Sequence, residues 1–314
     1  MKNDKNVLIT TSTFAQFDKT PLTMLEKADY RWTLNPYGRK VTEEELLKLI
    51  DGCVGVIAGT ENFSAEILKK ISSVKAIARC GSGLNNIDLE AAKKFSISVT
   101  NTLEAPTQAV AELTLGLMLS LLRKTHIMDR KLRDGQWEKK MGHLLFGKNV
   151  GIIGFGRIGQ RLAQLLAPFQ VQVAYYDIAK KETPVKFLAL KDLLKWVDIV
   201  CLHASSVEGK GFLLDRVEFE CMKKGAWLVN CSRGELINEE VLVEFLEQGK
   251  LAGAALDTFV KEPYVGPLTS LENVILTPHI GSYAVEARIQ MEINAVDNLL
   301  KSLNGVYAYG GVKK

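Results

Sequence analysis

Short apolar runs rich in β-branched residues alternate with helical patterns along most of the chain. This alternation is typical of a parallel β-sheet that carries helices on both faces. The expected strands are residues 7–10, 54–58, 76–79, 98–101, 149–154, 172–176, 199–203, 227–230, 252–256 and 274–277. One ordinary open sheet holds fewer strands than this, so the pattern predicts an α/β protein with more than one doubly wound parallel sheet.

A longer helical pattern with an apolar face, residues 110–121, separates the early strands from the later ones. Two α/β domains joined by this helix are the economical interpretation. Because the last helical pattern, residues 284–303, must dock on one of the domains, we expect the chain to cross back near Gly281.

Two of the expected helices carry end signals. Thr42 and Glu45 have the spacing of a capping box. Asn238 can cap a helix that Gly249 ends.

The composition narrows the class of protein. The chain has 314 residues, 47% of them hydrophobic, and a formal net charge of +4. This length agrees with about two domains, and the apolar content excludes a disordered chain. A dedicated nucleic-acid-binding protein usually shows a concentrated basic surface, which so small an excess of charge does not suggest. We therefore expect a small molecule as the partner, and neither nucleic acid nor a membrane.

Cysteine and histidine usage points to a reducing compartment. The five cysteines are scattered, and the four histidines never lie at metal-ligand spacing from one another. This pattern favours free thiols and no bound metal. The start of the chain lacks the apolar core of a signal peptide, and the most apolar helical pattern, residues 113–122, has about half the length that spans a bilayer. The sequence predicts a cytoplasmic protein.

The segment from Arg123 to Lys140 holds seven basic and three acidic residues, together with Trp137. It could form a surface for an anion or a nucleic acid, or a solvated helix and arm at a subunit contact. Because its charges are interspersed rather than blocked, the second interpretation is favoured.

A glycine-rich turn, Gly154-Phe155-Gly156-Arg157-Ile158-Gly159, follows one apolar strand and opens a helix. The first glycine allows the tight turn, the second lets the backbone approach a pyrophosphate, and the third lets the helix pack closely on the strand. The phosphate then lies at the helix N-terminus, where free N–H groups favour an anion. This arrangement predicts a dinucleotide site.

The next strand ends in Asp177, about 20 residues downstream, where a carboxylate accepts hydrogen bonds from the adenosine ribose. A carboxylate there repels a 2′-phosphate, so NAD is favoured over NADP. Lys180 and Lys181 follow closely and weaken that preference.

Three later strands end in polar residues that suit the reduction of a 2-oxo acid. Since the carboxyl ends of parallel strands share one edge of a sheet, we expect Arg233, Glu262 and His279 in one cleft. Arg233 offers a bidentate fork for a carboxylate. His279 could donate a proton to the carbonyl oxygen, and Glu262 would orient it and favour its charged form.

With these residues in place, the chain resembles the D-isomer-specific 2-hydroxyacid dehydrogenases, and most of all their phosphoglycerate dehydrogenase branch. The similarity covers nearly the whole length. The motifs that carry it are Ala78–Asp88, Asn101-Thr102, Ala111-Glu112, the glycine-rich turn, Asn230–Gly234, Ala254–Asp257 with Glu262-Pro263, and Pro278–Gly281.

The resemblance implies two Rossmann-like doubly wound parallel-sheet domains, one inserted into the other. Residues 1–101 plus 283–314 would form the substrate domain, and residues 102–282 the NAD-binding domain. The catalytic set would be Arg233, Glu262 and His279, and the enzyme would act as a homodimer. The cofactor would contact Gly154, Gly156, Arg157, Ile158, Gly159, Asp177, His203, Ala204, Cys231, Ser232, Asp257 and Gly281. The substrate would contact Arg79, Ser82, Gly83 and Arg233.

Departures from the family pattern leave the substrate open. Gly59 stands where phosphoglycerate enzymes of the animal type carry an arginine for the substrate phosphate, and Ala204 begins a loop that departs from the common Pro-Leu continuation. The expected activity is therefore NAD-dependent interconversion of a D-2-hydroxy acid and its 2-oxo acid, plausibly 3-phosphoglycerate. The alternatives are a glyoxylate or hydroxypyruvate reductase and a non-catalytic NAD-sensing corepressor.

Overall fold

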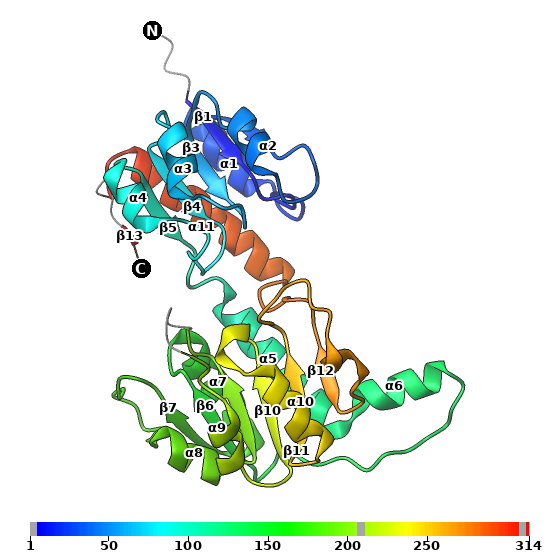
Figure 1. Cartoon of the computed structure of the whole chain (residues 1–314). Coiled ribbons are helices and arrows are strands. Elements are labelled where there is room, and N and C mark those ends of the chain that lie inside the picture. Colours follow the sequence, from blue (N-terminus) through cyan, green and yellow to red (C-terminus); the bar gives the residue numbers. More distant parts are fainter. Residues whose placement is uncertain (1–4, 206–210, 308–311, 314) are drawn as a thin grey trace. The chain divides into compact units, whose positions relative to one another are not determined.

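The computed structural model describes residues 5–205, 211–307 and 312–313 and divides into two compact units (Figure 1). One unit, called here the split unit, consists of residues 1–106 and 282–314. The other, the inserted unit, is continuous and consists of residues 107–281. The chain therefore enters the inserted unit once and returns from it once.

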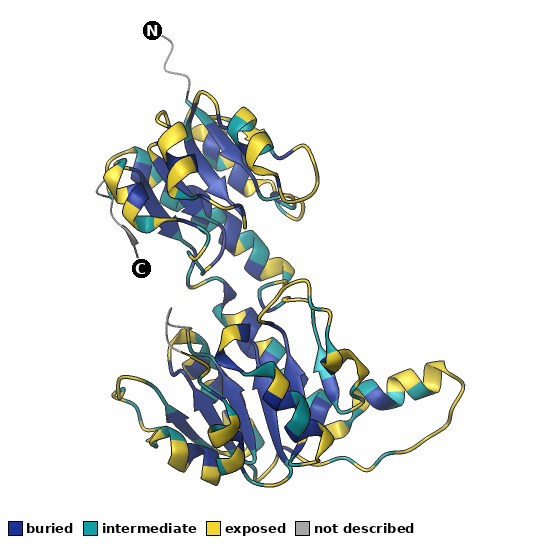
Figure 2. Ribbon diagram, viewed as in Figure 1, coloured by how far each residue is buried: buried dark blue, intermediate teal, exposed yellow. Residues whose placement is uncertain are grey.

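The split unit is built on one parallel sheet with strand order β13-β5-β4-β3-β1-β2. Helices α1 and α11 pack on one face, and α2, α3 and α4 cover the other. The buried strands between them form the centre of this unit (Figure 2). Its strands are β1 (Asn6–Ile9), β2 (Arg31–Leu34), β3 (Cys53–Ala58), β4 (Ala76–Arg79), β5 (Ser98–Asn101) and β13 (Val312–Lys313), and its helices are α1 (Thr20–Lys27), α2 (Glu43–Leu49), α3 (Ala65–Lys70), α4 (Leu89–Lys94) and α11 (Val285–Leu303).

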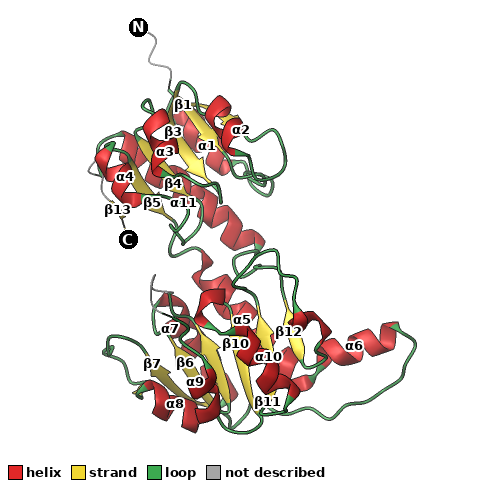
Figure 3. Ribbon diagram, in the orientation of Figure 1, coloured by secondary structure: helices red, strands yellow, loops and turns green. Residues whose placement is uncertain are grey.

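The inserted unit is also built on a parallel sheet, with strand order β12-β11-β10-β9-β6-β7-β8. Helices α5 and α7 line one core, and α8, α9 and α10 line the other (Figure 3). The strands are β6 (Asn149–Ile153), β7 (Gln172–Tyr176), β8 (Lys186–Phe187), β9 (Ile199–Leu202), β10 (Ala226–Asn230), β11 (Leu251–Leu256) and β12 (Val274–Leu276), and the helices are α5 (Pro106–Arg123), α6 (Thr125–Arg133), α7 (Arg157–Leu166), α8 (Leu190–Trp196), α9 (Arg216–Cys221) and α10 (Glu239–Glu247).

Both sheets share one feature that positions ligands. β1 lies between β2 and β3, and β6 lies between β7 and β9, so each sheet reverses its strand order beside its first strand. In open parallel sheets, ligands bind outside the carboxyl ends of the strands at this switch point. Each unit therefore has one edge at which polar loops gather.

The predicted α/β class with doubly wound parallel sheets is confirmed. Three short strands were missed, β2, β8 and β13. β2 is an edge strand with alternating exposure, and β8 and β13 have only two residues each, Lys186–Phe187 and Val312–Lys313. The capping box at α2 is present, since Thr42 accepts a hydrogen bond from the Glu45 amide and Glu45 accepts one from the Thr42 amide. Within the described ranges, no helix combines the length and the apolar character that crossing a bilayer requires.

Candidate active site and cofactor site

Glycines shape the turn between β6 and α7. Gly154 has φ of +91°, in the left-handed region that favours glycine, and a Cβ there would collide with the backbone of Ala204. A Cβ on Gly159 would collide with the carbonyl oxygen of Gly154. Gly156, by contrast, has open space where its Cβ would be. The first and third glycines thus fix the turn, and the second leaves the N-terminus of α7 open to a pyrophosphate.

Asp177 follows β7 and lies beside this turn. Its Oδ2 accepts a hydrogen bond from the Phe155 amide at 2.7 Å, and its Oδ1 accepts one from the Ala179 amide at 3.1 Å. The Lys181 ammonium lies 4.0 Å from Oδ1. The Asp177 carboxylate therefore also stabilises the glycine-rich turn. The Lys181 ammonium partly offsets the negative charge of Asp177, which would repel a 2′-phosphate.

His203 follows β9 at the same edge of the sheet. Both of its ring nitrogens are buried, and neither has a hydrogen-bond partner among residues 5–205, 211–307 and 312–313. Burial lowers the pKa of His203 to about 4, because desolvation disfavours the imidazolium. Buried polar atoms are nearly always paired, so these nitrogens mark a place that a bound cofactor could satisfy.

Arg233 stands on a tight turn after β10. The buried Asn230 accepts hydrogen bonds from the Ser232 amide at 3.0 Å and hydroxyl at 2.8 Å, and it donates one to the Arg233 carbonyl at 2.9 Å. Arg233 Nη1 donates to the Ser232 carbonyl at 2.7 Å. A Cβ on Gly234 would collide with the backbone of Phe259, so this turn packs directly on the segment that follows β11. Asn230 thus determines the conformation that presents Arg233.

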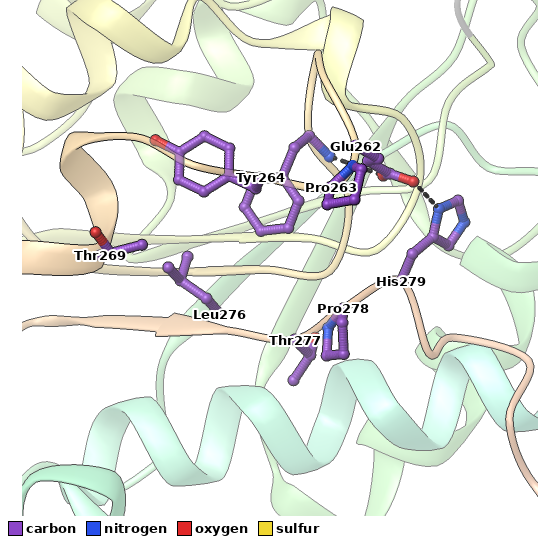
Figure 4. A pocket seen from close by; sticks show the side chains of 9 residues that line it. Glu262, Pro263, Tyr264, Thr269, Leu276, Thr277, Pro278 and His279 are labelled. Atoms are coloured by element: carbon purple, nitrogen blue, oxygen red, sulfur yellow. Dashed lines mark hydrogen bonds and ion pairs between the residues drawn. The ribbon is translucent and has the colours of Figure 1, made fainter.

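Glu262 and His279 form a direct pair, with Oε2 2.8 Å from Nδ1 (Figure 4). The other carboxylate oxygen of Glu262 accepts a hydrogen bond from the Phe259 amide at 3.1 Å. The Glu262 side chain is 38% exposed and the His279 side chain is 50% exposed. Because Glu262 engages Nδ1, Nε2 is left for a reacting group. His279 also has φ of +54°, a strained conformation for a residue with a side chain and one that clusters at functional sites.

Asp257 positions the segment that carries His279. It is buried, and it accepts hydrogen bonds from the Thr277 hydroxyl at 2.6 Å, the Ile280 amide at 2.8 Å and the Gly281 amide at 2.8 Å. Burial raises the pKa of Asp257 above its usual value, and these hydrogen bonds oppose the shift. One carboxylate therefore holds both flanks of His279.

A pocket of about 560 Å³ lies beside the Glu262–His279 pair. Phe259 and Tyr264 form a stacked pair in its wall, with ring centroids 4.4 Å apart. The other lining residues are Pro263, Thr269, Leu276, Thr277 and Pro278 (Figure 4). Arg233 is not among them, so within the inserted unit the structure pairs Glu262 with His279 and leaves Arg233 on its own turn.

Three of the four predicted substrate contacts, Arg79, Ser82 and Gly83, lie at the carboxyl edge of the split unit, and the fourth, Arg233, lies in the inserted unit. Arg79 ends β4 and donates from Nη1 to the carbonyl of Cys80. The Gly81 amide donates to the Thr102 hydroxyl at 2.8 Å, and Asn101 donates to the Ser82 carbonyl at 2.8 Å. The loop with Ser82 and Gly83 is thereby held against the end of β5.

The cysteines give no candidate nucleophile at either edge. All five are free, and burial raises the pKa of the Cys80 thiol to about 11 and of the Cys231 thiol to about 12, so both are protonated at neutral pH. No group of three or more metal-ligating side chains gathers in the parts of the chain that the structure describes.

Two positioning residues were missed in the sequence, Asn230 and Thr277. Each is polar and follows directly on the apolar residues of its strand, Asn230 as the last residue of β10 and Thr277 just after β12. A polar residue at the carboxyl end of an apolar strand was the signal that could have found them.

Comparisons with known proteins agree with this geometry. The family described as "D-isomer specific 2-hydroxyacid dehydrogenase, NAD binding domain" matches residues 115–281. A hydroxypyruvate reductase of Thermotoga maritima is 38% identical over 89% of this chain and 96% of its own length. A D-3-phosphoglycerate dehydrogenase of Methanocaldococcus jannaschii is 37% identical over 85% of this chain and 53% of its own length.

A solved structure has the same fold over nearly the whole chain. The TT0316 protein of Thermus thermophilus superimposes with a TM-score of 0.90 at 36% identity, covering 96% of this chain and 97% of that one. The glycine-rich turn and the polar strand ends therefore lie in a fold, and in a sequence, shared with these relatives. The chain belongs to the D-isomer specific 2-hydroxyacid dehydrogenase family and is an NAD-dependent enzyme of that family.

Proposed function

We propose that this enzyme uses NADH to reduce a short 2-oxo acid, hydroxypyruvate to D-glycerate or glyoxylate to glycolate, and catalyses the reverse reaction. The observation that carries this proposal is the 2.8 Å contact between Glu262 and a His279 held in a strained backbone conformation. The hydroxypyruvate reductase, matched over nearly its full length, supports the choice of substrate. Phosphohydroxypyruvate, the substrate that the resemblance to the phosphoglycerate branch favours, is the competing candidate.

In this proposal, each candidate catalytic residue of the inserted unit has its own role in the reaction. Bound NADH supplies the hydride that is transferred to the carbonyl carbon. The carboxylate of the substrate accepts the bidentate fork of Arg233, which fixes the orientation of the carbonyl group. His279 gives the proton on Nε2 to the carbonyl oxygen, so the oxo group becomes a hydroxyl, and in the reverse direction it takes that proton back. Glu262 orients the ring through Nδ1, which leaves Nε2 for the substrate.

The cofactor contacts that we propose come from residues at the carboxyl edge of the same sheet. Backbone groups of Gly154, Gly156, Arg157, Ile158 and Gly159 would bind the pyrophosphate, and Asp177 the adenosine ribose. The remaining contacts would come from His203, Ala204, Cys231, Ser232, Asp257 and Gly281. In the split unit, Arg79 with the loop of Ser82 and Gly83 would bind the substrate, so we propose that this unit is the substrate domain.

We also propose a homodimer formed through the arm that follows α5, which is the segment of α6 and the residues after it that include Trp137 and Met141. Trp137 is 81% exposed and Met141 88% exposed, which is unusual for side chains of this size. The base of the arm is tied to its own unit, because Lys140 lies 2.8 Å from Glu272 and His126 contacts the Glu272 carbonyl at 3.2 Å. Sedimentation of the purified protein would show a dimer, and Trp137→Ser would shift it toward monomer. The free thiols support a location in the reducing cytoplasm.

A panel of 2-oxo acids read by NADH absorbance tests the activity. Pyruvate, glyoxylate, hydroxypyruvate and phosphohydroxypyruvate differ in size and charge beyond the reacting carbon. We expect the highest kcat/KM for hydroxypyruvate or glyoxylate. Preferred turnover of phosphohydroxypyruvate would favour the phosphoglycerate reaction, and binding of NADH without turnover of any acid would favour an NAD-sensing role.

A further inference from the structure

A buried carboxylate occupies the switch point of the split unit. Glu61 follows β3 and is 3% exposed. Its Oε2 accepts a hydrogen bond from the Thr10 hydroxyl at 2.5 Å and another from the Gly59 amide at 2.9 Å. Thr10 follows β1, so the Glu61 side chain joins the carboxyl ends of the two strands between which the strand order reverses.

The backbone around this residue is tied to the loop that we propose for substrate binding. The side-chain amide of Asn86 donates to the Glu61 carbonyl at 2.6 Å and reaches the Gly59 carbonyl at 3.4 Å. Asn86 lies in the loop after β4, the same loop that contains Ser82 and Gly83. Asn86 therefore links the turn of Glu61 to the candidate substrate loop.

Four of the five loops after the strands β1 to β5 at this edge of the split unit carry no positive charge. The loop after β2, residues 35–42, contains Arg39, which pairs with Glu45, and Lys40. The loops that follow β1, β3, β4 and β5, residues 10–18, 59–64, 80–88 and 102–105, contain no lysine, arginine or histidine. They contain four acidic residues, Asp18, Glu61, Asp88 and Glu104.

Two further arginines lie close to this edge, and both are engaged. Arg79 donates to the carbonyl of Cys80. Arg288, at the start of α11, has its Nε 2.6 Å from a carboxylate oxygen of the buried Glu292. A phosphate dianion here would therefore meet Glu61 without a cluster of cations to offset it.

The backbone at position 59 depends on the same carboxylate. A Cβ on Gly59 would lie 3.0 Å and 3.2 Å from the two oxygens of Glu61, which is closer than ordinary van der Waals contact. A side chain at position 59 would therefore require the Glu61 carboxylate to shift by a few tenths of an ångström. Gly59 and Glu61 thus place a carboxylate, and no cation, just after β3.

We propose that Glu61 is a specificity residue, which selects acids whose end distal to the reacting carbon carries no negative charge and discriminates against a phosphate there. The proposal rests on the function proposed above, because it assumes that this edge binds a 2-oxo acid. The physical reason is repulsion between two anions, which is stronger near a buried carboxylate than in bulk water.

Hydroxypyruvate and phosphohydroxypyruvate provide the test, since they differ by the phosphate alone. We would measure kcat/KM for both with NADH, using the full-length protein and Glu61→Gln, which keeps the shape of the side chain and removes its charge. Wild type should prefer hydroxypyruvate by about 100-fold or more. In Glu61→Gln, the preference should fall about tenfold.

Three further variants separate charge from structure. Glu66→Gln removes an exposed carboxylate from the first turn of α3 and should leave the preference unchanged. Thr10→Val removes a hydrogen bond but keeps the charge of Glu61, so it should change both kcat/KM values by the same factor. Thr10→Val with Glu61→Met replaces both partners of the Thr10–Glu61 hydrogen bond and leaves only the Gly59 amide without its acceptor, so it serves if Glu61→Gln unfolds.

The outcomes distinguish the two proposals. Equal use of both substrates by wild type, or a preference that neither charge-free variant lowers, overturns the role of Glu61 while the proposed reaction stands. Absence of turnover with either substrate overturns the proposed reaction, and the role of Glu61 with it.

Discussion

The two units have the same strand order around their first strand but fill the switch point in opposite ways. In the inserted unit, α7 begins four residues after β6, and Gly156 leaves the helix N-terminus open. In the split unit, the ten residues from Thr10 to Lys19 separate β1 from α1, and none is a glycine. That longer loop is held by Glu292, which accepts a hydrogen bond from the Ala15 amide at 2.8 Å.

This difference teaches that the fold alone does not set what each unit binds. Open backbone amides at the end of a helix attract an anion, whereas the Glu61 carboxylate repels one. Two sheets of one topology can therefore serve opposite electrostatic tasks. On this view the inserted unit sets the rate of the reaction, and the split unit sets its selectivity.

The largest effect on this division of roles between the two units should come from removing the proposed proton donor, His279. His279→Ala should lower kcat by about 10²-fold or more, because general acid catalysis contributes on that order, while NADH still binds. The loss should be equal for hydroxypyruvate and phosphohydroxypyruvate, unlike the effect of Glu61→Gln. His126→Ala, the same substitution at a partly exposed site in the inserted unit, serves as the control. Unchanged turnover in His279→Ala would exclude the proposed acid.

A second effect should appear in stability rather than rate, at the buried edge of the inserted unit. Burial lowers the pKa of His203 to about 4 from an unfolded value of 6.5. Between pH 6.5 and pH 4, the ring is therefore protonated in the unfolded chain but not in the folded chain. The stability from this group is complete above pH 6.5 and is lost as the pH falls toward 4. Between pH 8 and pH 5 the loss should be about 2 kcal/mol.

The measurement is urea unfolding of wild type and His203→Gln at both pH values, without cofactor. The variant should lose less stability on acidification, by about 2 kcal/mol. His143→Gln, a change of histidine in the same unit, controls for the substitution itself. Parallel pH dependence in wild type and His203→Gln would show that this ring does not set the acid sensitivity.

Local patterns predicted the inserted unit's switch point, but they could not predict that of the split unit. The glycine spacing of the turn after β6 and the position of Asp177 follow from short stretches of sequence, because turn and strand geometry are local. Thr10 and Glu61 are 51 residues apart, and their hydrogen bond depends on how β1 and β3 pair. For the same reason, the sequence did not reveal the hydrogen bonds by which Asp257 positions the His279 segment, 20 to 24 residues away.

A smaller effect would sharpen the assignment of the open backbone. Gly156→Ala places a methyl group in open space at the start of α7, so the fold should tolerate it while a pyrophosphate is kept away. We expect the Kd for NADH to rise about tenfold with an unchanged unfolding midpoint. Gly159→Ala is the matched comparison, because its Cβ collides with the Gly154 carbonyl and should lower stability as well. Unchanged NADH affinity in Gly156→Ala would contradict the pyrophosphate site.

The smallest effect concerns the choice between NADH and NADPH at Asp177. Asp177→Asn retains an oxygen for the Phe155 amide but removes the charge, so it should lower the ratio of kcat/KM for NADH over NADPH by about fivefold through lost repulsion of the 2′-phosphate. Lys181 lies 4.0 Å from that carboxylate, so Lys181→Ala should move the ratio in the opposite direction, by about twofold. Opposite shifts would establish that charge, rather than the shape of the turn, selects the cofactor. If both variants shifted the ratio in the same direction, Asp177 would act chiefly by holding the glycine-rich turn, and the inserted unit would discriminate by geometry where the split unit uses charge.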